Sequence, residues 1–192
     1  MTTLHSKSSQ QIKQIQQERL PSTRRILRAL PSAIIEGDLE KVKKLADQLE
    51  KHVIKGEDDQ SSGNLLSSAP INKFGWTSLH AACYYGKLDI VRFLCQSQSA
   101  DPNAKNFNGW NALIFAVMGY ALQMHGSDGG THSVDVIKFL LSSTSVDYLA
   151  ADKSGNTATY YAQSIDQTGV LSESLKSQIK LRQNPAPATV DL

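Results

Sequence analysis

Cysteine is scarce in this chain, and long apolar runs are missing. The 192 residues contain two cysteines, Cys83 and Cys95, which are too few for the disulfide framework of a small secreted domain. We expect both to be reduced and to serve as small core residues. No apolar run approaches the roughly 20 residues of a membrane-spanning helix. Lys7 and Lys13 are not followed by the apolar segment of a signal peptide. These absences predict a cytoplasmic, intracellular chain.

Motifs for catalysis and cofactor binding are also missing. The sequence has no phosphate-binding loop, no dinucleotide fingerprint, no zinc-protease motif and no nucleophile elbow. His125, Asp128 and His132 could ligate zinc by residue type, but their spacing fits no established zinc pattern and glycines surround them. His80 has no recognisable nucleophile arrangement beside it. The sequence therefore predicts no enzyme, no metal and no cofactor.

What is present is a helix–turn–helix unit at residues 72–104, which reads NKFGWTSLHAACYYGKLDIVRFLCQSQSADPNA. Gly75 supplies a turn, and Gly86 closes the short helix that begins near Thr77. A second helix follows, with Leu88 and Leu94 at helical spacing. This unit resembles an ankyrin repeat, with Ser78 in place of the family's proline and Asn72 in place of its opening aspartate. One such unit cannot bury its own apolar face, so it predicts neighbours.

Those neighbours recur in steps of about 33 residues. Residues 109–113 repeat 75–79, residues 134–141 repeat 88–95, Asp152 opens another unit, and residues 33–39 match 82–88. The resemblance implies an all-α ankyrin-repeat solenoid of about four units over residues 30–180, whose first helix begins at Leu30. We expect two inserts, near 56–70 and 121–132, and a disordered tail at 181–192. The insert from Gly56 to Ala69 is polar and is expected to be flexible and dispensable for folding.

Positive charge is concentrated in a basic polar arm at residues 1–29. Through Pro31 the chain has six lysines and arginines but only Glu18 as an acid, and the net charge of the whole chain is +2. One interpretation is a set of capping helices, with Ile26, Leu27 and Leu30 covering the end of the stack. The other is an arm that binds acidic protein, nucleic acid or anionic membrane. The capping interpretation is favoured.

The resemblance also implies a binding face. Ankyrin stacks bind partners on their concave side, through the hairpin tips and the outward face of the first helices. Six of the nine matching positions in the second and third units are aromatic, and aromatic residues are enriched at protein interfaces. Of the two adjacent tyrosines, Tyr84 is expected to point into the concavity. A purely structural alternative is that Trp76 and Trp110 stack on each other. The matching positions are Lys73, Phe74, Trp76, Tyr84, Tyr85, Phe107, Asn108, Trp110, Met118, Lys153, Ser154, Asn156 and Ser164.

These patterns predict a monomeric, non-enzymatic module that binds a protein partner and acts as an adaptor, an inhibitor or a competitor. The alternative is a peripheral protein that the basic arm holds to nucleic acid or to an anionic membrane. Ankyrin proteins occur in eukaryotic cells and among effectors that intracellular bacteria deliver into host cytoplasm. A small array with long inserts is compatible with such an effector.

Overall fold

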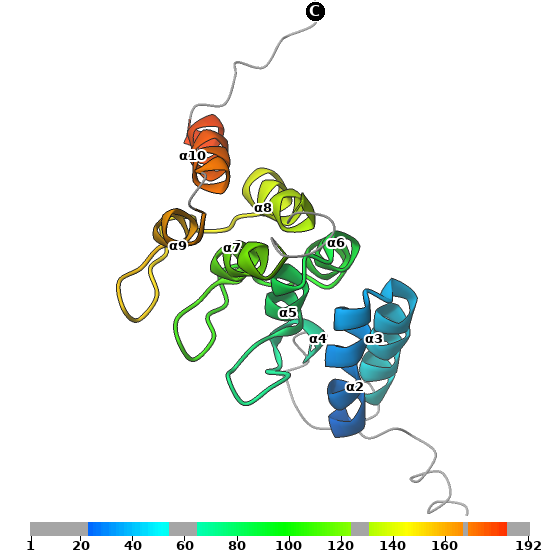
Figure 1. Ribbon diagram of the computed structural model, residues 1–192. Coiled ribbons are helices and arrows are strands. Elements are labelled where there is room, and N and C mark those ends of the chain that lie inside the picture. Colours follow the sequence, from blue (N-terminus) through cyan, green and yellow to red (C-terminus); the bar gives the residue numbers. More distant parts are fainter. Residues whose placement is uncertain (1–22, 54–64, 124–130, 167–168, 184–192) are drawn as a thin grey trace, which may run out of the picture.

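The protein is a stack of antiparallel helix pairs (Figure 1), seen here in a computed structural model that describes residues 23–53, 65–123, 131–166 and 169–183. The first pair joins α2 (Thr23–Glu36) to α3 (Leu39–Val53), and the second joins α5 (Ser78–Tyr84) to α6 (Leu88–Ser97). The third joins α7 (Ala112–Gln123) to α8 (Thr131–Ser143), and the fourth joins α9 (Ala158–Ile165) to α10 (Val170–Gln183). A short helix, α4 (Leu65–Ser68), precedes the second pair. Within the described residues all of these elements are helical, so the predicted all-α repeat solenoid is confirmed.

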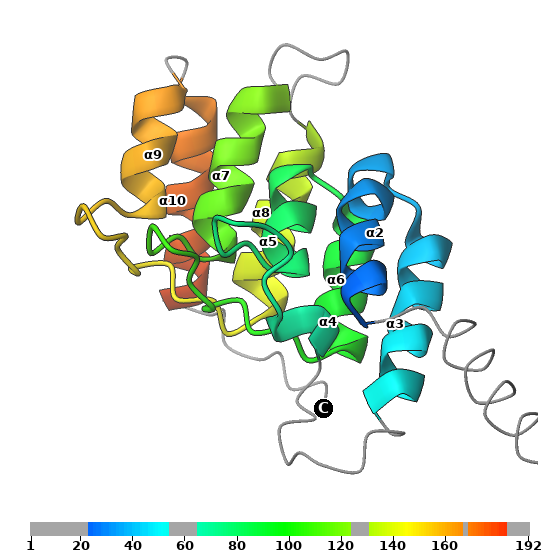
Figure 2. The ribbon, with the colours of Figure 1, turned by 90° about the horizontal axis from the view of Figure 1, so that it is seen from below.

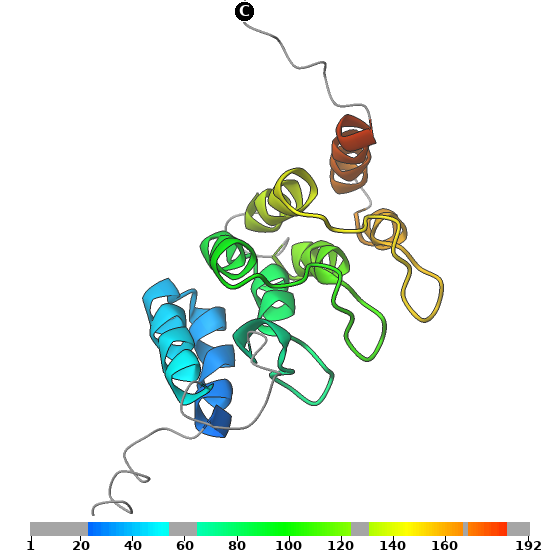
Figure 3. The same ribbon diagram turned by 180° about the vertical axis from the view of Figure 1, so that it is seen from behind.

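The first helices of the pairs form one layer and the second helices form another. Figure 3 shows the same two layers from behind. Three loops project from the layer of first helices, ahead of α5, α7 and α9, and they lie side by side in Figures 1 and 2. No helix in the described ranges is long and apolar enough to cross a membrane.

One hydrophobic core runs through the stack. Leu30, Leu79 and Leu113 occupy equivalent places in successive first helices, and all three are fully buried. The core extends from Ile26 in α2 to Leu175 in α10 without a break between repeats. Burial of this apolar surface is the main term that stabilises the array, because each repeat covers the face of the next.

Helix α2 corrects the predicted start of the first repeat. A separate helix was expected to begin at Leu30, but α2 runs continuously from Thr23 through Pro31 to Glu36. Proline lacks the N–H that a helix interior uses, so it usually ends or kinks a helix. Here Ile26 and Leu30 are buried before Pro31, and Ala33 and Ile34 are buried after it, so both halves of α2 are held against the core. The predicted domain boundary between residues 29 and 30 therefore falls inside α2.

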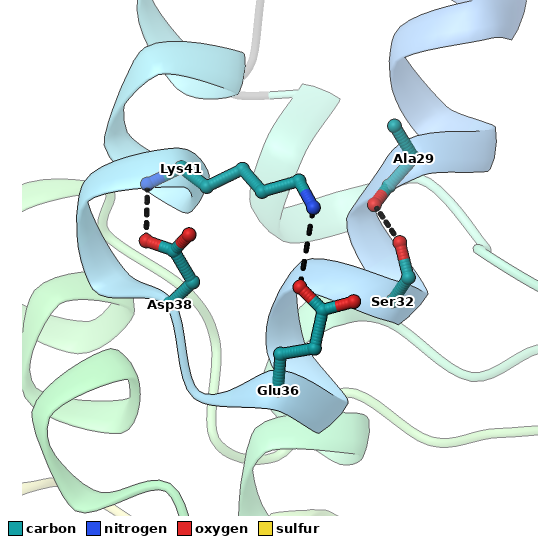
Figure 4. Close-up of polar contacts among 5 residues, drawn as sticks. All are labelled: Ala29, Ser32, Glu36, Asp38 and Lys41. Carbon is teal, nitrogen blue, oxygen red and sulfur yellow. Dashed lines mark hydrogen bonds and ion pairs between the residues drawn. The ribbon is translucent and has the colours of Figure 1, made fainter.

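The turn from α2 to α3 is held by local polar contacts (Figure 4). The backbone N–H of Lys41 donates to the carboxylate of Asp38, 2.9 Å away, which satisfies one of the open donors at the start of α3. The ammonium of Lys41 lies 3.2 Å from the carboxylate of Glu36. The hydroxyl of Ser32, next to Pro31, donates to the carbonyl of Ala29.

The predicted inserts and tail need three further corrections. Leu66 of α4 is fully buried, so the stretch 56–69 is not wholly a dispensable loop. Helix α8 begins at Thr131, within the predicted second insert, and α10 continues to Gln183, three residues into the predicted tail. An apolar side chain explains the first difference, because Leu66 is buried in the short helix that contacts α5. The other predictions for these segments fall outside the described residues, on 1–22, 54–64, 124–130 and 184–192.

Candidate protein-binding face

The three projecting loops share one hydrogen-bonding device. At Asn72, Asn106 and Asp152, a side-chain oxygen accepts the backbone N–H groups two and four residues further along, at distances of 2.8–3.1 Å. Short Asn and Asp side chains are suited to closing turns in this way. The device explains why asparagine can stand where the family uses aspartate. It also gives the three hairpin tips, residues 72–75, 106–109 and 152–155, a common conformation.

Neighbouring tips are bonded to one another. The N–H of Phe107 donates to the carbonyl of Phe74 at 3.2 Å, and the N–H of Lys153 donates to the carbonyl of Asn108 at 3.0 Å. The ring of Phe107 lies against Gly75, where an added Cβ would stand 2.7 Å from a ring carbon. Phe107 nevertheless keeps 62% of its surface exposed, and Phe74 keeps 54%. The tips therefore present two aromatic side chains on a row of linked loops.

Behind the tips, seven aromatic rings form a continuous line across three repeats, which we call the aromatic line. Phe115, fully buried in α7, lies at its centre, with Trp76 at 4.7 Å and Trp110 at 5.5 Å between ring centroids. Both tryptophans meet Phe115 edge to face, the arrangement that aromatic quadrupoles favour. Phe115 thus stands between the two tryptophans, which the structural alternative had expected to stack on each other. In order, the line is Tyr85, Tyr84, Trp76, Phe115, Trp110, Tyr161 and Tyr160.

Asp152 fixes the orientation of two of these rings. Its second carboxylate oxygen accepts the indole N–H of Trp110 at 3.1 Å and the hydroxyl of Tyr161 at 2.6 Å. Burial raises the pKa of Asp152, but hydrogen bonds from Tyr161, Asn156, Ser154 and Trp110 outweigh burial and hold that pKa below its usual value. Trp110 is therefore a structural residue as well as a half-buried part of the face, and its replacement would disturb packing and surface together.

His80 links the second repeat to the third. One ring nitrogen accepts the N–H of Thr77 at 3.0 Å, and the other donates to the carbonyl of Ala104 at 2.9 Å. The neutral ring can make both bonds, since one nitrogen accepts and the other donates. Burial lowers the pKa of His80 to about 4, and this outweighs the hydrogen bond to Ala104 and the charge of Asp101, which raise the pKa. With both nitrogens engaged in a fully buried site, His80 is a structural residue. Sequence reasoning had given it this role.

The third repeat replaces this histidine with Ile114 and makes the link differently. The side-chain oxygen of Asn111 accepts the N–H of Ile114 at 3.1 Å, and its amide group donates to the carbonyl of Asp147 at 3.0 Å. One asparagine thus caps α7 and bonds to the loop of the next repeat. Asn111 was not singled out in the sequence, although its place at the start of a first helix, equivalent to Thr77, is a signal for a cap.

The thiols and the imidazoles give no sign of chemistry in the described part of the chain. Cys83 and Cys95 are free thiols. Burial raises the pKa of the Cys83 thiol, and burial raises the pKa of Cys95 to about 11, so both are protonated at neutral pH. The described ranges contain no group of three or more His, Cys, Asp or Glu side chains that could hold a metal. Of the histidine–aspartate set in the second insert, His125 and Asp128 lie outside those ranges.

The structure distributes the remaining predicted site residues over the loops and first helices. Tyr84 lies between Tyr85 and Trp76 in the aromatic line, whereas Tyr85, at the end of the line, also borders a pocket beside Gly37 and Lys87. Met118 is half-buried in α7, and Asn156 is half-buried in the third loop. The ammonium of Lys73 lies 5.2 Å above the ring of Phe74. Exposed at the surface are Lys73, Asn108, Lys153, Ser154 and Ser164.

Sequence reasoning missed the residues that join the line. Phe115 and Tyr161 stand at the position that Ala81 occupies in the second repeat. The sequence did contain a signal for them, because these two positions hold a large ring where the unit at residues 72–104 has alanine. Each of these rings contacts the tryptophan of the repeat before it: Phe115 packs on Trp76, and Tyr161 packs on Trp110.

The comparison with known families agrees with this architecture. The sequence model described as ankyrin repeats (3 copies) matches residues 30–125. The chain belongs to the ankyrin-repeat family. Over 148 residues, 77% of the chain, this ankyrin-repeat protein is 28% identical to the human transient receptor potential cation channel subfamily A member 1. It spans 11% of that channel's length.

A solved structure gives the same fold. A chain in the crystal structure of the yeast ribosomal protein Rps3 in complex with its chaperone Yar1 matches with a TM-score of 0.52 and 20% identity. The match covers 80% of this ankyrin-repeat chain and 89% of the other. At this level of identity the likeness concerns the fold.

Proposed function

We propose that this ankyrin-repeat chain is a non-enzymatic interaction module that docks a protein partner on the face formed by its hairpin tips and aromatic line. The observation that carries the proposal is the continuity of this face. Exposed Phe74 and Phe107 lie on bonded loops, in front of partly exposed rings contributed by three repeats. Aromatic rings that are grouped at a protein surface mark interaction sites, and aromatic anchors dominate the free energy of many interfaces.

Binding itself would then be the activity. The molecule would act as an adaptor, an inhibitor or a competitor for another protein's site. That a solved structural neighbour belongs to a complex of two proteins agrees with a protein as the partner class. We extend the proposal to action in the cytoplasm, including that of a host cell if the chain is a delivered effector.

The experiment compares two double variants that remove the same kind of surface. Phe74→Ser with Phe107→Ser takes both rings from the tips, and Leu149→Ser with Leu181→Ser removes two leucines that are 68% and 63% exposed elsewhere. Each immobilised protein is incubated with cytoplasmic extract, and captured proteins are quantified by mass spectrometry. We expect the wild type and the leucine variant to capture the same partner.

The phenylalanine variant should bind that partner about thirtyfold more weakly, because truncating an anchor residue often costs 2 kcal/mol or more. Equal capture by all three proteins would refute the face as the docking site. The alternative, a nucleic-acid- or membrane-binding arm, predicts instead that capture disappears when residues 1–22 are removed and that the phenylalanine variant is unaffected.

A further inference from the structure

A groove lies between α2 and the first hairpin loop. It encloses about 560 Å³ and is lined by Leu27, Arg28, Pro70, Ile71, Asn72 and Lys73. Leu27 and Ile71 are partly buried against the core, whereas Arg28 and Lys73 are exposed. The groove therefore combines an apolar floor with two cations at its edge. It opens beside the hairpin tip that carries Phe74.

Positive charge continues along the tips. Lys153 is exposed on the third tip, and Lys105, in the second loop, extends its ammonium to the carbonyl of Ala151 at 3.1 Å. Asp152 is the one carboxylate within the three tips, and it is occupied by hydrogen bonds from Trp110 and Tyr161 and from two backbone N–H groups. On the first helix, Glu36 is paired with Lys41 (Figure 4). Within the described residues, no ion pair joins Arg28, Lys73 or Lys153 to an acidic side chain.

The spacing suits a short peptide segment. Packed helices lie about 8–10 Å apart, so two repeat steps place Lys73 and Lys153 roughly 20 Å from each other. An extended segment of about six residues spans that distance. Phe107 belongs to the tip between the two lysines, and Phe74 stands next to Lys73. A segment lying along the tips would meet Lys73 at one end, the rings of Phe74 and Phe107 in the middle, and Lys153 at the other end.

We propose that this groove and the hairpin tips bind an acidic segment of the partner protein that also carries apolar side chains. Its carboxylates would meet Arg28, Lys73 and Lys153, and its apolar side chains would pack on Phe74, Phe107 and the groove floor. The inference rests on the proposed function and adds the chemistry of the partner. A protein is favoured over nucleic acid because the chain's net charge is only +2, and nucleic-acid-binding domains carry an extended basic stripe.

The test measures binding of synthetic peptides by fluorescence anisotropy. Three labelled peptides of about 12 residues, twice the estimated span, alternate Glu with Leu, Lys with Leu, or Glu with Ser. We expect the Glu–Leu peptide to bind the wild type most tightly, the Glu–Ser peptide to bind more weakly, and the Lys–Leu peptide not to bind. Raising the salt should weaken the binding of the Glu–Leu peptide, because exposed ion pairs are screened.

The double variant Lys73→Gln with Lys153→Gln should bind the Glu–Leu peptide about tenfold more weakly than wild type, since exposed ion pairs contribute up to about 1 kcal/mol each. The matched control, Lys44→Gln with Lys180→Gln, changes the net charge equally at exposed positions on α3 and α10 and should leave binding unchanged. Equal losses in both double variants, or equal binding of the Lys–Leu peptide, would overturn the inference.

Two further outcomes would also overturn it. One is preferential binding of a poly-dT oligonucleotide or of phosphatidylserine vesicles over the Glu–Leu peptide. The other is a captured partner that depends on Phe74 and Phe107 but is insensitive to salt and to the Lys73→Gln, Lys153→Gln change. In that last case the proposed docking face stands, and only the acidic nature of the partner is refuted.

Discussion

Ser78 occupies the first position of α5 with a buried hydroxyl that has no hydrogen-bond partner. A desolvated polar group without a partner is unfavourable. Thr77, the preceding cap residue, has φ −90° and ψ 171°, the extended conformation that proline imposes on the residue before it. The first helical position also tolerates proline well, because its N–H has no acceptor within the helix. The site is therefore built for the proline that the family pattern places there.

We predict that Ser78→Pro raises the free energy of unfolding by about 0.5–1 kcal/mol, chiefly by restricting the unfolded chain. Urea unfolding followed by circular dichroism measures the change. Ser78→Ala separates the two causes, because alanine removes the hydroxyl without restricting the backbone. A proline variant that is less stable than wild type would mean that the N–H of Ser78 is needed or that the ring does not fit.

His80 makes stability depend on pH in a defined window. Its pKa is about 4 in the folded protein, below the ordinary value of 6.5, because burial opposes the charged ring. The unfolded chain therefore binds a proton more readily than the folded one. The stability that neutral His80 contributes is fully present above pH 6.5 and is lost progressively as the pH falls from 6.5 to 4. Asp152, whose folded pKa is depressed, loses its contribution at still lower pH.

We predict that the wild type loses roughly 2–3 kcal/mol between pH 7.5 and 4.5 from this one residue. In His80→Gln that pH dependence should be much smaller, although the variant starts from a lower stability because its links to Thr77 and Ala104 are disturbed. Urea midpoints at several pH values for both proteins make the comparison. Parallel curves for the two proteins would show that His80 is not the titrating group.

At the scale of single elements, α7 depends on one glycine for its approach to α5. A Cβ added to Gly119 would stand 2.1 Å from the backbone carbonyl oxygen of Tyr84. That obstacle is main chain, so a side-chain rotation cannot relieve it. Gly119 stands at the position that Tyr85 occupies in the preceding repeat. Because it has no side chain, the longer α7 can pass close to the end of α5. Met118, the residue before Gly119, is partly buried against the core.

We predict that Gly119→Ala destabilises the protein by about 1–3 kcal/mol or more, because overpacking outweighs the gain of about 1 kcal/mol in helix propensity. Tryptophan fluorescence should change as well, since Trp76 packs on Tyr84. The control is Gly155→Ala, at an exposed tip where an added Cβ meets nothing within 4 Å. Its positive φ will cost some stability, but its tryptophan spectrum should match wild type. An unchanged spectrum in Gly119→Ala would contradict the tight contact.

The repeat register was predictable because Gly–Trp recurs at the turns and leucine recurs in the first helices. The loop turns were predictable for a similar reason. Each turn is closed by a side chain that bonds to backbone N–H groups within four residues, at Asn72, Asn106 and Asp152, so a single position indicates the turn. Three features could not be predicted, because they depend on tertiary contacts. Pro31 stays inside α2 only because buried neighbours hold both sides, Leu66 gains its place from α5, and Phe115 joins two tryptophans from separate loops. The positions of the proposed binding face came from the family pattern, and the contacts between its aromatic rings came from the fold.

At the scale of the whole molecule, each repeat is stabilised mainly by its immediate neighbours. Helix α2 packs on α3 and α5, and it contributes Ile26, Leu30 and Ile34 to the core. Stability in such an array is nearly a sum of repeat terms and neighbour interfaces, so damage at one end spreads from that end. The first turns of α2 therefore contribute to the core of the array, within the segment 1–29 that the sequence offered as a cap or as a basic arm.

This arrangement changes where the chain can be cut to test that arm. We predict that residues 23–192 keep the stability of the fold, because this chain contains the whole described core. Residues 31–192 lack Ile26 and Leu30, two fully buried side chains worth roughly 1.5–3 kcal/mol each. The shorter chain should lose protection from amide hydrogen exchange first in α3 and α5, while α9 and α10 stay protected longer. Hydrogen exchange followed by mass spectrometry resolves these helices separately. Equal protection in the two chains would show that the first turns of α2 are dispensable, and a uniform loss through α10 would show that the array unfolds as a single cooperative unit.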